Sequence, residues 1–403
     1  MRKTLLFFFL LISFSGFTQE VPLVPLDEDA QISVLTMGPG KDLYDSFGHS
    51  AIRLKDLSLA IDVTYNYGVY DFSDPNFYAK FAKGQMRYVL DRRNTERFLR
   101  NYIDNNRWVK EQVLDLTPEE VQQMFEFLEN NLKPENRAYN YDFFYDNCAT
   151  KIPLIIDQIV PELKIDSSFV EQPQTFRTLI QENVHWNTWG SFGMDLGIGS
   201  VVDRTAPIYD HMFLPEYVFK AFEKAERVDG GNARPMVKAS KDLFVNEPEP
   251  LESNFWTSPL LVCLLIGLLI IWLTYRDYKN ERRSRYLDAV LHIFLGLVGV
   301  IFLLLWFATD HYTTAYNYNL LWAFPLNLLL AFQLGKKHPK RWTKGYLKFL
   351  ILMLVLLTMH WNIGVQIFPK ALIPFLIALA VRYFYLLKTI DKDLLPAVED
   401  NGA

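Results

Sequence analysis

The pattern of hydrophobic and polar positions divides the chain into two parts. From about Gln19 to Phe255, apolar and polar residues alternate over short distances, which is typical of a globular domain of useful size. Beyond Phe255, long apolar runs follow one another, as they do in membrane-spanning helices. We expect about five spans, at Ser258–Tyr275, Leu287–Ala308, Tyr316–Leu334, Tyr346–His360 and Ala371–Leu387.

The first part predicts short strands and helices in no regular order. Apolar, β-branched runs predict the strands, and period-two alternation is clearest in Leu59–Tyr70. The segment Thr117-Pro118-Glu119-Glu120 is a capping box with proline at the first helical position, so a helix begins there. Such a mixture is typical of an α+β domain. We expect strands at Ile32–Thr36, His49–Leu54, Leu59–Tyr70 and Val109–Leu116, and helices at Asn76–Lys83, Thr95–Asn105, Thr117–Leu132 and Ala149–Val160.

Two independent features place the first part outside the cell membrane. Residues 1–19 combine a basic start with the apolar run Leu5–Phe17, which is typical of a signal peptide or a signal anchor. Lys and Arg are concentrated after the first and third expected spans, whereas Thr309–Tyr318 and Trp361–Phe368 contain neither. By the positive-inside rule, the two basic loops are cytoplasmic. We therefore expect a multi-pass protein of the inner membrane with a large N-terminal domain in the periplasm.

Composition sets the remaining boundaries. Gly230–Ala233 and Glu247–Pro250 have the glycine and proline content of a linker, so residues 229–255 are expected to connect a periplasmic domain, residues 20–228, to the membrane. Residues 256–388 then form an all-α transmembrane bundle and residues 389–403 a cytoplasmic tail. The net charge of −5 gives no reason to expect a nucleic-acid partner.

One cysteine outside the apolar runs is the first candidate for chemistry. Of the two cysteines, Cys263 lies within an expected span, whereas Cys148 follows Asn147 at the expected start of a helix. An exported thiol without a disulfide partner in its own chain is a liability in an oxidising compartment, which suggests that the thiol is used. The free amides at a helix start favour the thiolate, the nucleophilic form. The alternative is an inert structural cysteine.

A thiolate nucleophile needs a base, and histidine is the usual one. The exported part offers His49, His185 and His211. His49 follows Gly48 at the start of an expected strand, whereas the other two are better explained by packing or by surface positions. A third polar group usually orients the imidazole. Asp62 on the next strand is the expected orienter by hairpin geometry, and Tyr65 and Asn66 are weaker candidates.

Other reaction classes lack the necessary motifs. The sequence contains no metal-ligand spacing, phosphate-binding loop or G-x-S-x-G elbow, so we expect no cofactor and no metal. Candidate substrate contacts lie near the cysteine and on the loops between the spans. Polar loop residues of the bundle are candidate contacts as well, with ordinary loop and aromatic-belt positions as the alternative. The candidates for substrate binding are Asn66, Tyr141, Tyr145, Asn147, His311 and Asn319.

Several segments resemble the Lnb-type lipoprotein N-acyltransferases of Bacteroidota. The most specific are Gly48–Arg53 (GHSAIR) and Asn147–Thr150 (NCAT), in that order, and the resemblance extends over nearly the whole chain. That family is similar in turn to circularly permuted papain-like, NlpC-like enzymes, a group that includes lecithin:retinol acyltransferase and in which His precedes Cys. Further matching segments are Thr36–Gly40, Asn66–Phe72, Tyr141–Phe144, Leu196–Gly199 with Asp203, Phe213–Pro215, Asp310–Thr314 and Asn317–Trp322.

The resemblance implies an acyl transfer with Cys148 as the nucleophile and His49 as the base. The acyl donor would be a membrane phospholipid and the acceptor the N-terminal amine of a diacylglyceryl lipoprotein. Two alternatives remain open from the residues alone. One is an NlpC-type cell-wall cysteine peptidase or amidase, although no wall-binding module is evident, and the other is a non-catalytic membrane assembly factor.

Overall fold

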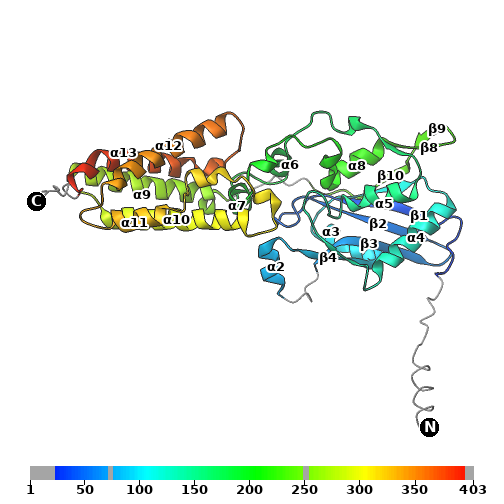
Figure 1. Ribbon diagram of the computed structural model, residues 1–403. Helices are drawn as coiled ribbons and strands as arrows, with labels where there is room; N and C mark the ends of the chain where they lie inside the picture. The colour runs from blue at the N-terminus through cyan, green and yellow to red at the C-terminus, as the bar shows by residue number, and fades with distance from the viewer. Residues whose placement is uncertain (1–22, 71–75, 248–253, 395–403) are drawn as a thin grey trace, which may run out of the picture.

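The computed structural model describes residues 23–70, 76–247 and 254–394. An α+β domain comes first and a bundle of helices follows, and the two lie end to end (Figure 1). This order confirms the predicted fold class. The expected export signal, residues 1–19, lies outside the described residues.

The N-terminal domain is built on a seven-stranded antiparallel sheet with the strand order β10-β5-β1-β2-β3-β4-β6. Strand β1 lies between β5 and β2 and buries both of its faces, with Ile32 and Val34 in one hydrophobic cluster and Leu35 and Met37 in another. The predicted hairpin is present as β2 and β3, although its turn lies at residues 57–60. The strands are β1 Gln31–Met37, β2 His49–Asp56, β3 Ile61–Tyr70, β4 Arg87–Asn94, β5 Val109–Leu114, β6 Ala138–Asn140 and β10 Val237–Phe244.

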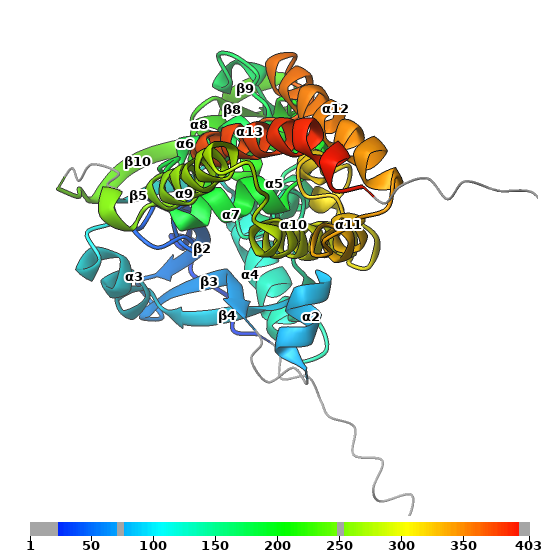
Figure 2. The same ribbon diagram turned by 90° about the vertical axis from the view of Figure 1, so that its left-hand side faces the viewer.

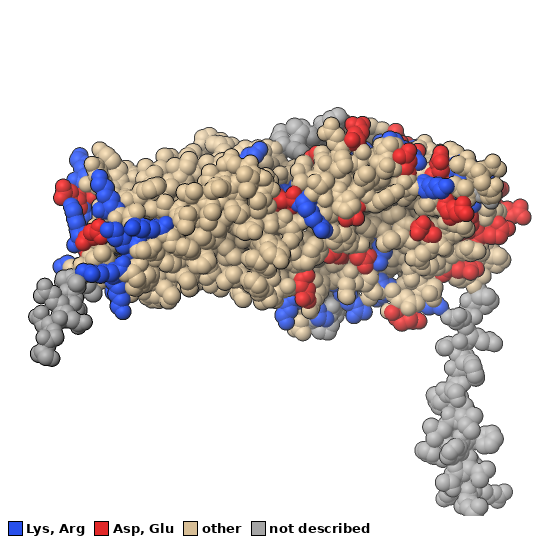
Figure 3. All heavy atoms as spheres, turned by 45° about the horizontal axis from the view of Figure 1, so that its top comes forward, with Lys and Arg blue, Asp and Glu red and all other residues tan. Residues whose placement is uncertain are grey.

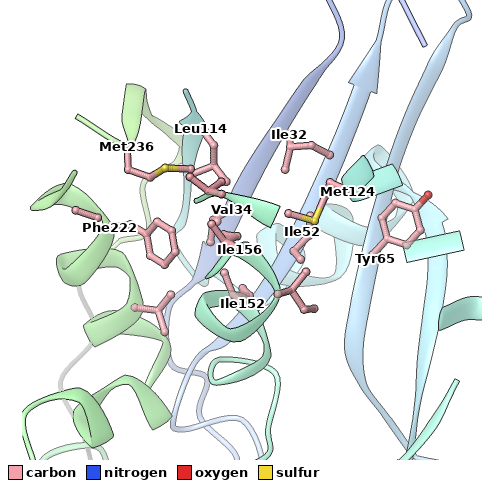
Figure 4. Close-up of a cluster of buried hydrophobic side chains, with 14 of the residues drawn as sticks. Ile32, Val34, Ile52, Tyr65, Leu114, Met124, Ile152, Ile156, Phe222 and Met236 are labelled. Atoms are coloured by element: carbon pink, nitrogen blue, oxygen red, sulfur yellow. The ribbon is translucent and has the colours of Figure 1, made fainter. Parts of the chain in front are cut away.

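Helices cover both faces of this sheet. Helices α4 (Pro118–Leu132), α5 (Lys151–Ile159) and α8 (Pro215–Glu223) pack on one face, where Ile152 and Ile156 of α5 are fully buried (Figure 4). Helix α3 (Thr95–Asp104) packs on the other face. Truncating a buried isoleucine to alanine typically costs about 2–5 kcal/mol, so these contacts fix α5 against the strands.

The prediction that residues 229–255 form a linker is wrong over most of that range. Residues 229–247 belong to the domain, because β8 (Ala225–Asp229) and β9 (Asn232–Pro235) form a hairpin and β10 then joins the main sheet beside β5. The glycine pair that suggested a linker forms the hairpin turn, with φ of +55° at Gly230 and +89° at Gly231. Strand β10 is an edge strand with mostly exposed side chains, so it lacks a strong hydrophobic signal.

Three more helices and a short strand complete the domain. They are α2 Phe77–Lys83, α6 Phe176–Glu182, α7 Trp189–Gly197 and β7 Leu163–Ile165. Strand β7 pairs with β8, and α7 lies on the side of the domain that faces the bundle (Figure 1).

Among the described residues, four helices are long and apolar enough to cross a membrane. They match four of the five expected spans. Lys and Arg gather at the end of the bundle away from the N-terminal domain, and the flank between the two ends is almost free of charge (Figure 3). The helices are α9 Pro259–Lys279, α10 Arg285–Phe307, α12 Trp342–Asn362 and α13 Ile373–Thr389.

The third expected span, Tyr316–Leu334, is a broken segment rather than one helix. It consists of a 3₁₀ turn, Tyr318–Leu321, and the short helix α11, Asn327–Leu334. It nevertheless runs the length of the bundle, because Ser200 of the domain bonds the Tyr316 carbonyl at 3.2 Å and Arg283 at the far end bonds the Leu334 carbonyl at 2.6 Å.

Two glycines of α10 let the broken segment approach closely. A methyl group on Gly299 would lie 2.1 Å from the carbonyl oxygen of Ala323, and one on Gly296 would lie 2.6 Å from the Leu328 side chain. Both gaps are far below van der Waals contact, so larger residues at these positions would push the segment away. Proline at position 325 explains the break, because it cannot donate the backbone hydrogen bond that a continuous helix needs there.

A buried arginine organises the junction between the domain and the bundle. Arg177 of α6 is fully buried and pairs with Asp203 at 2.8 Å and with Asp195 at 2.9 Å. Its other nitrogen donates to the carbonyls of Ile198 and Gly199. The arginine therefore fixes the shape of residues 195–203, a segment that we call the docking loop.

The docking loop bonds directly to the bundle. The Asn317 amide donates to the Leu196 carbonyl at 2.7 Å, and the Gly199 amide donates to the Thr313 carbonyl at 2.8 Å. Asp203 also accepts a bond of 3.1 Å from the amide of Ile367. Two separate loops of the bundle are thus tied to one loop of the domain.

Candidate functional site

Cys148 and His49 meet at one end of the sheet. His49 is the first residue of β2 and follows Gly48, whose φ of +78° and close approach to the Met37 carbonyl suit glycine alone. Cys148 lies in a turn just before α5, as expected. Asn147 shapes this turn, because its side-chain oxygen accepts from the amides of Ala149 at 2.8 Å and Thr150 at 2.9 Å. Both reactive side chains are partly buried.

The two groups perturb each other's pKa in opposite directions. Burial raises the pKa of the Cys148 thiol, but the charge and hydrogen bond of His49, with the backbone amides of Ser50 and Ala149, outweigh burial and lower it. Burial lowers the pKa of His49, but the charge of Cys148 and hydrogen bonds to Cys148 and Asn66 outweigh it, so the pKa is raised. Both shifts move the pair toward a thiolate beside an imidazolium, the form in which a cysteine acts as a nucleophile.

Asn66, rather than Asp62, holds the imidazole. The Nε2 atom of His49 lies 2.7 Å from the Asn66 side-chain oxygen. The other ring nitrogen, Nδ1, therefore remains available to the thiol. An amide oxygen in this place fixes the orientation of the imidazole beside the thiol. A bulge in the β3–β4 pairing between Asn66 and Val69 accompanies this position.

The expected role of Asp62 is wrong. Asp62 is paired across the hairpin with Lys55, six residues along β2 from His49, or about 20 Å at the rise of a strand. Its carboxylate instead binds Arg53 through two bonds, at 2.6 and 2.8 Å. The hairpin turn at residues 57–60 sets this register.

Gly68 makes room for the imidazole. A methyl group at this position would lie 2.5 Å from Cε1 of His49 and 3.1 Å from the Asn66 side-chain oxygen. Both distances are shorter than ordinary contacts, so any larger residue would displace the ring or its partner. Gly68 is therefore part of the geometry of the site although it carries no functional group.

The thiol and the imidazole open into a pocket of about 760 Å³, which we call the Cys148 pocket. Its wall combines the loop before β2, the end of α3 and the strands β3 and β4. Tyr102 of α3 stacks on His49 with ring centroids 6.1 Å apart, and Arg107 lies over Tyr102 at 4.8 Å. Arg107 is also paired with Asp45 at 3.2 Å.

The other predicted contact residues divide into two groups. Tyr141 lines the Cys148 pocket, and burial first and then the charge of Cys148 raise its pKa, so its hydroxyl stays protonated. Asn147 reaches the same pocket, but its amide also bonds the carbonyls of Phe143 and Phe213 and serves the turn. Tyr145 faces away and accepts a hydrogen bond from Arg204 at 2.6 Å.

The two bundle candidates lie outside the pocket wall. His311 packs beside Gly84 at the start of the loop after α10. Asn319 is fully buried and bonds the carbonyls of Asp195 and Leu196, so it belongs to the junction rather than to a lipid path. The two other histidines of the domain, His185 and His211, do not line the pocket either.

Sequence reasoning missed Gly68, Tyr102 and Arg107. Gly68 lies two residues after Asn66, but its role depends on the strand bulge. Tyr102 and Arg107 are brought to the pocket by the packing of α3, which no local motif announces. In the part of the chain that the structure describes, no cluster of three or more His, Cys, Asp or Glu side chains suits a metal ion.

Fold and site together define a class of protein. It is a membrane protein whose extramembrane α+β domain holds a cysteine thiol beside an imidazole, and an asparagine side chain orients that imidazole. Comparison with protein-family models makes the identification specific. Residues 26–182 match the Lnb N-terminal periplasmic domain, and residues 251–393 match the Lnb transmembrane domain. The chain is an Lnb-type protein. A search of curated proteins and a search of solved structures found no match.

Proposed function

We propose that this protein is a membrane-bound lipoprotein N-acyltransferase. Cys148 is the nucleophile, His49 the acid and base, and Asn66 the residue that orients His49. The observation that carries the proposal is the lowered pKa of the thiol beside an imidazole held by Asn66, inside a pocket of an Lnb-type domain. The acyl donor is a membrane phospholipid and the acceptor is a diacylglyceryl lipoprotein.

The first half-reaction transfers the acyl chain to the enzyme. The Cys148 thiolate attacks the ester carbonyl of the phospholipid, so a carbon–sulfur bond forms and the carbon–oxygen bond of the ester breaks. The His49 imidazolium gives its proton to the departing alkoxide, which leaves as the alcohol of a lysophospholipid. The products of this step are a Cys148 thioester and a neutral imidazole.

The second half-reaction transfers the chain to the lipoprotein. The α-amine of its N-terminal cysteine attacks the thioester, so a carbon–nitrogen bond forms and the carbon–sulfur bond breaks. Neutral His49 takes the proton that the amine loses, and the sulfur leaves as the thiolate. The thiolate–imidazolium pair is restored, and the product is an amide-linked third acyl chain.

The bundle supports a lipid donor. An enzyme acting on a soluble substrate needs only one anchoring helix, whereas the described residues include four helices of membrane-spanning length and a broken fifth segment. Hydrogen bonds from the docking loop tie the domain to those helices. The pocket therefore has a fixed position relative to the membrane in which the donor lies.

The test is the mass of lipoprotein N-termini from cells without another acyltransferase. Wild-type protein and the matched control Cys263→Ala should give an amide-linked third chain, because Cys263 lies on α9. Cys148→Ala should give the free amine while the protein still accumulates in the membrane, because a small side chain in a turn contributes little to stability. Triacylated lipoprotein made by Cys148→Ala would refute the proposal, and wall-peptide cleavage by the wild type would favour a peptidase.

The proposed localisation is the inner membrane, with the N-terminal domain in the periplasm. Most exposed basic residues of the bundle lie at its far end (Figure 3), and they include those of the loop after α9 and of the loop around Lys340. A reporter fused after Arg285 or Lys344 should be active in the cytoplasm, and one within residues 309–318 should be active in the periplasm. The opposite pattern would contradict the proposed orientation.

A further inference from the structure

The loop between β1 and β2 shows a large apolar tip to the outside. Most of its residues from Gly40 to Gly48, Tyr44 among them, line one wall of the Cys148 pocket. At its tip the side chain of Tyr44 is 78% exposed and that of Leu43 is 44% exposed. Large exposed side chains that lie next to each other are typical of a surface that contacts a partner or a membrane.

The loop is held from behind, so this exposure is built into its shape. The Gly40 amide donates to the Asp45 carbonyl at 2.9 Å, and the Gly48 amide donates to the same carbonyl at 3.2 Å. The Asp45 carboxylate pairs with the buried Arg107 at 3.2 Å. These bonds close the loop and leave Leu43 and Tyr44 on its outer side.

Two contacts that run through α7 connect this tip to the start of α9. A methyl group on Gly190 of α7 would lie 2.9 Å from a Leu43 methyl carbon, so Leu43 rests on α7. The neighbouring Trp189 donates from its indole to the Thr257 carbonyl at 2.7 Å, two residues before α9 begins at Pro259. The tip therefore lies close to the level at which α9 begins.

Other exposed aromatic side chains also lie near the level at which α9 begins. Trp186, Trp189, Phe255 and Trp256 are all exposed, and Trp256 is 78% exposed. Phe255 and Trp256 pack against each other immediately before α9, with ring centroids 5.9 Å apart. Tryptophan and tyrosine gather at the boundary between lipid tails and water. We define the interfacial rim as Leu43, Tyr44, Trp186, Trp189, Phe255 and Trp256.

The bundle does not cover the whole domain above it. Seen from the bundle end, α3 and strands β2 to β4 lie to one side of the helices (Figure 2). The Cys148 pocket is lined by residues of these elements, among them His49 of β2 and Tyr102 of α3. A lipid beside the bundle thus lies under the elements that line the pocket.

We propose that the interfacial rim sits in the headgroup region of the bilayer and that a diacyl phospholipid reaches the Cys148 pocket sideways from the membrane, over Leu43 and Tyr44. The partner is the lipid surface that faces the N-terminal domain. Its role as a substrate rests on the proposed function, whereas the contact with the bilayer does not. The observations that carry it are the braced loop, its contact with α7 and the continuity of the rim with α9.

Site-specific fluorescence tests the contact without any activity. Full-length protein lacking both native cysteines, with Cys148→Ala and Cys263→Ala, receives Tyr44→Cys, is labelled with the fluorophore NBD and is placed in phospholipid nanodiscs. The control is Leu57→Cys, because Leu57 is 82% exposed in the β2–β3 turn, at the far end of β2. Nitroxide groups near the lipid headgroup should quench the probe at position 44 at least about twofold more than that at position 57. Equal quenching at the two positions would overturn the proposal.

Kinetics test the route of the lipid. The double variant Leu43→Ser, Tyr44→Ser should raise the KM for phospholipid in a bilayer roughly tenfold, because it removes two apolar anchors. The control Leu57→Ser, which lies outside the pocket wall, should leave both the KM and kcat within about twofold of wild type. An unchanged KM would refute the lateral route. If wild-type protein acylates no lipoprotein, the proposed function fails, and the quenching result still decides the membrane contact.

Discussion

Replacing Gly68 with alanine should disable the site through a single methyl group. That methyl would lie 2.5 Å from Cε1 of His49, where ordinary contact begins at 3.4 Å, so the imidazole has to move by about 0.9 Å. The same methyl would lie 3.1 Å from the Asn66 oxygen, so the ring cannot keep both partners. A misplacement of about 1 Å at a reacting group lowers rates about 10²-fold. We expect that loss in kcat/KM.

The measurement is the alkylation rate of Cys148 by iodoacetamide as a function of pH, together with lipoprotein acylation. In Gly68→Ala the alkylation profile should shift to higher pH, because the displaced imidazole no longer offsets the effect of burial on the thiol. The matched control is Gly193→Ala on α7, where an added methyl meets no atom within 4 Å. If Gly68→Ala matches the control in both measurements, Gly68 does not set the position of His49 and the geometric argument fails.

Three further predictions concern the thiol, its orienter and the junction. Because the pKa of Cys148 is lowered, alkylation of the wild type should stay fast below the thiol's ordinary pKa of 9.0 and decline only as the pH falls through the lowered value; a profile centred near 9 would contradict the ion pair. Asn66→Ala should reduce acylation roughly 10²-fold and Asp62→Asn should not, because only Asn66 contacts the imidazole; equal losses would refute the assignment. Arg177→Met should lower the free energy of unfolding by about 3–5 kcal/mol, because it strands two buried carboxylates. The exposed Arg100→Met should change it by less than about 0.5 kcal/mol in the same denaturation experiment.

Local sequence signals predicted much of the N-terminal domain. The capping box is present as expected, with Thr117 and Glu120 bonded to each other's backbone amides at 2.8 and 3.3 Å. The alternation in Leu59–Tyr70 predicted a strand, and β3 occupies Ile61–Tyr70, although its four central residues, Thr64 to Tyr67, are all buried because both faces of the sheet are covered there. Strand β10 was missed because an edge strand with exposed side chains carries little of that signal.

The nucleophile and the base of the site were predictable, because few residue types can take these roles. Cys148 and His49 were expected to meet, and the structure places them together. The choice of Asp62 over Asn66 failed because the position of a hairpin turn sets which residues face each other, and a shift of the turn moves every pair. Tyr102 and Arg107 depend on the packing of α3 against the sheet, which is a tertiary property.

The bundle shows a different limit of prediction. Hydropathy marks Tyr316–Leu334 as an apolar span, and Pro325 indicates an interruption within it. The sequence does not reveal that the backbone there forms a 3₁₀ turn followed by a short helix. The glycines at positions 296 and 299 become meaningful only when the segment that packs on them is known. Buried charge pairs at the far end, such as Arg382 with Asp277 at 2.9 Å and with Asp288 at 2.8 Å, likewise become evident only in three dimensions.

The docking loop has a consequence for preparing the N-terminal domain by itself. A protein that ends before Asn254 would keep the main sheet and Arg177, but the carbonyls of Leu196 and Gly197 would lose the Asn317 amide that binds them. Phe192 and Leu196, which pack against the core of the bundle, would face water. Exposing such apolar side chains favours self-association. A soluble fragment is therefore expected to aggregate through α7, and substitutions of Phe192 and Leu196 by polar residues are the first remedy for crystallising it.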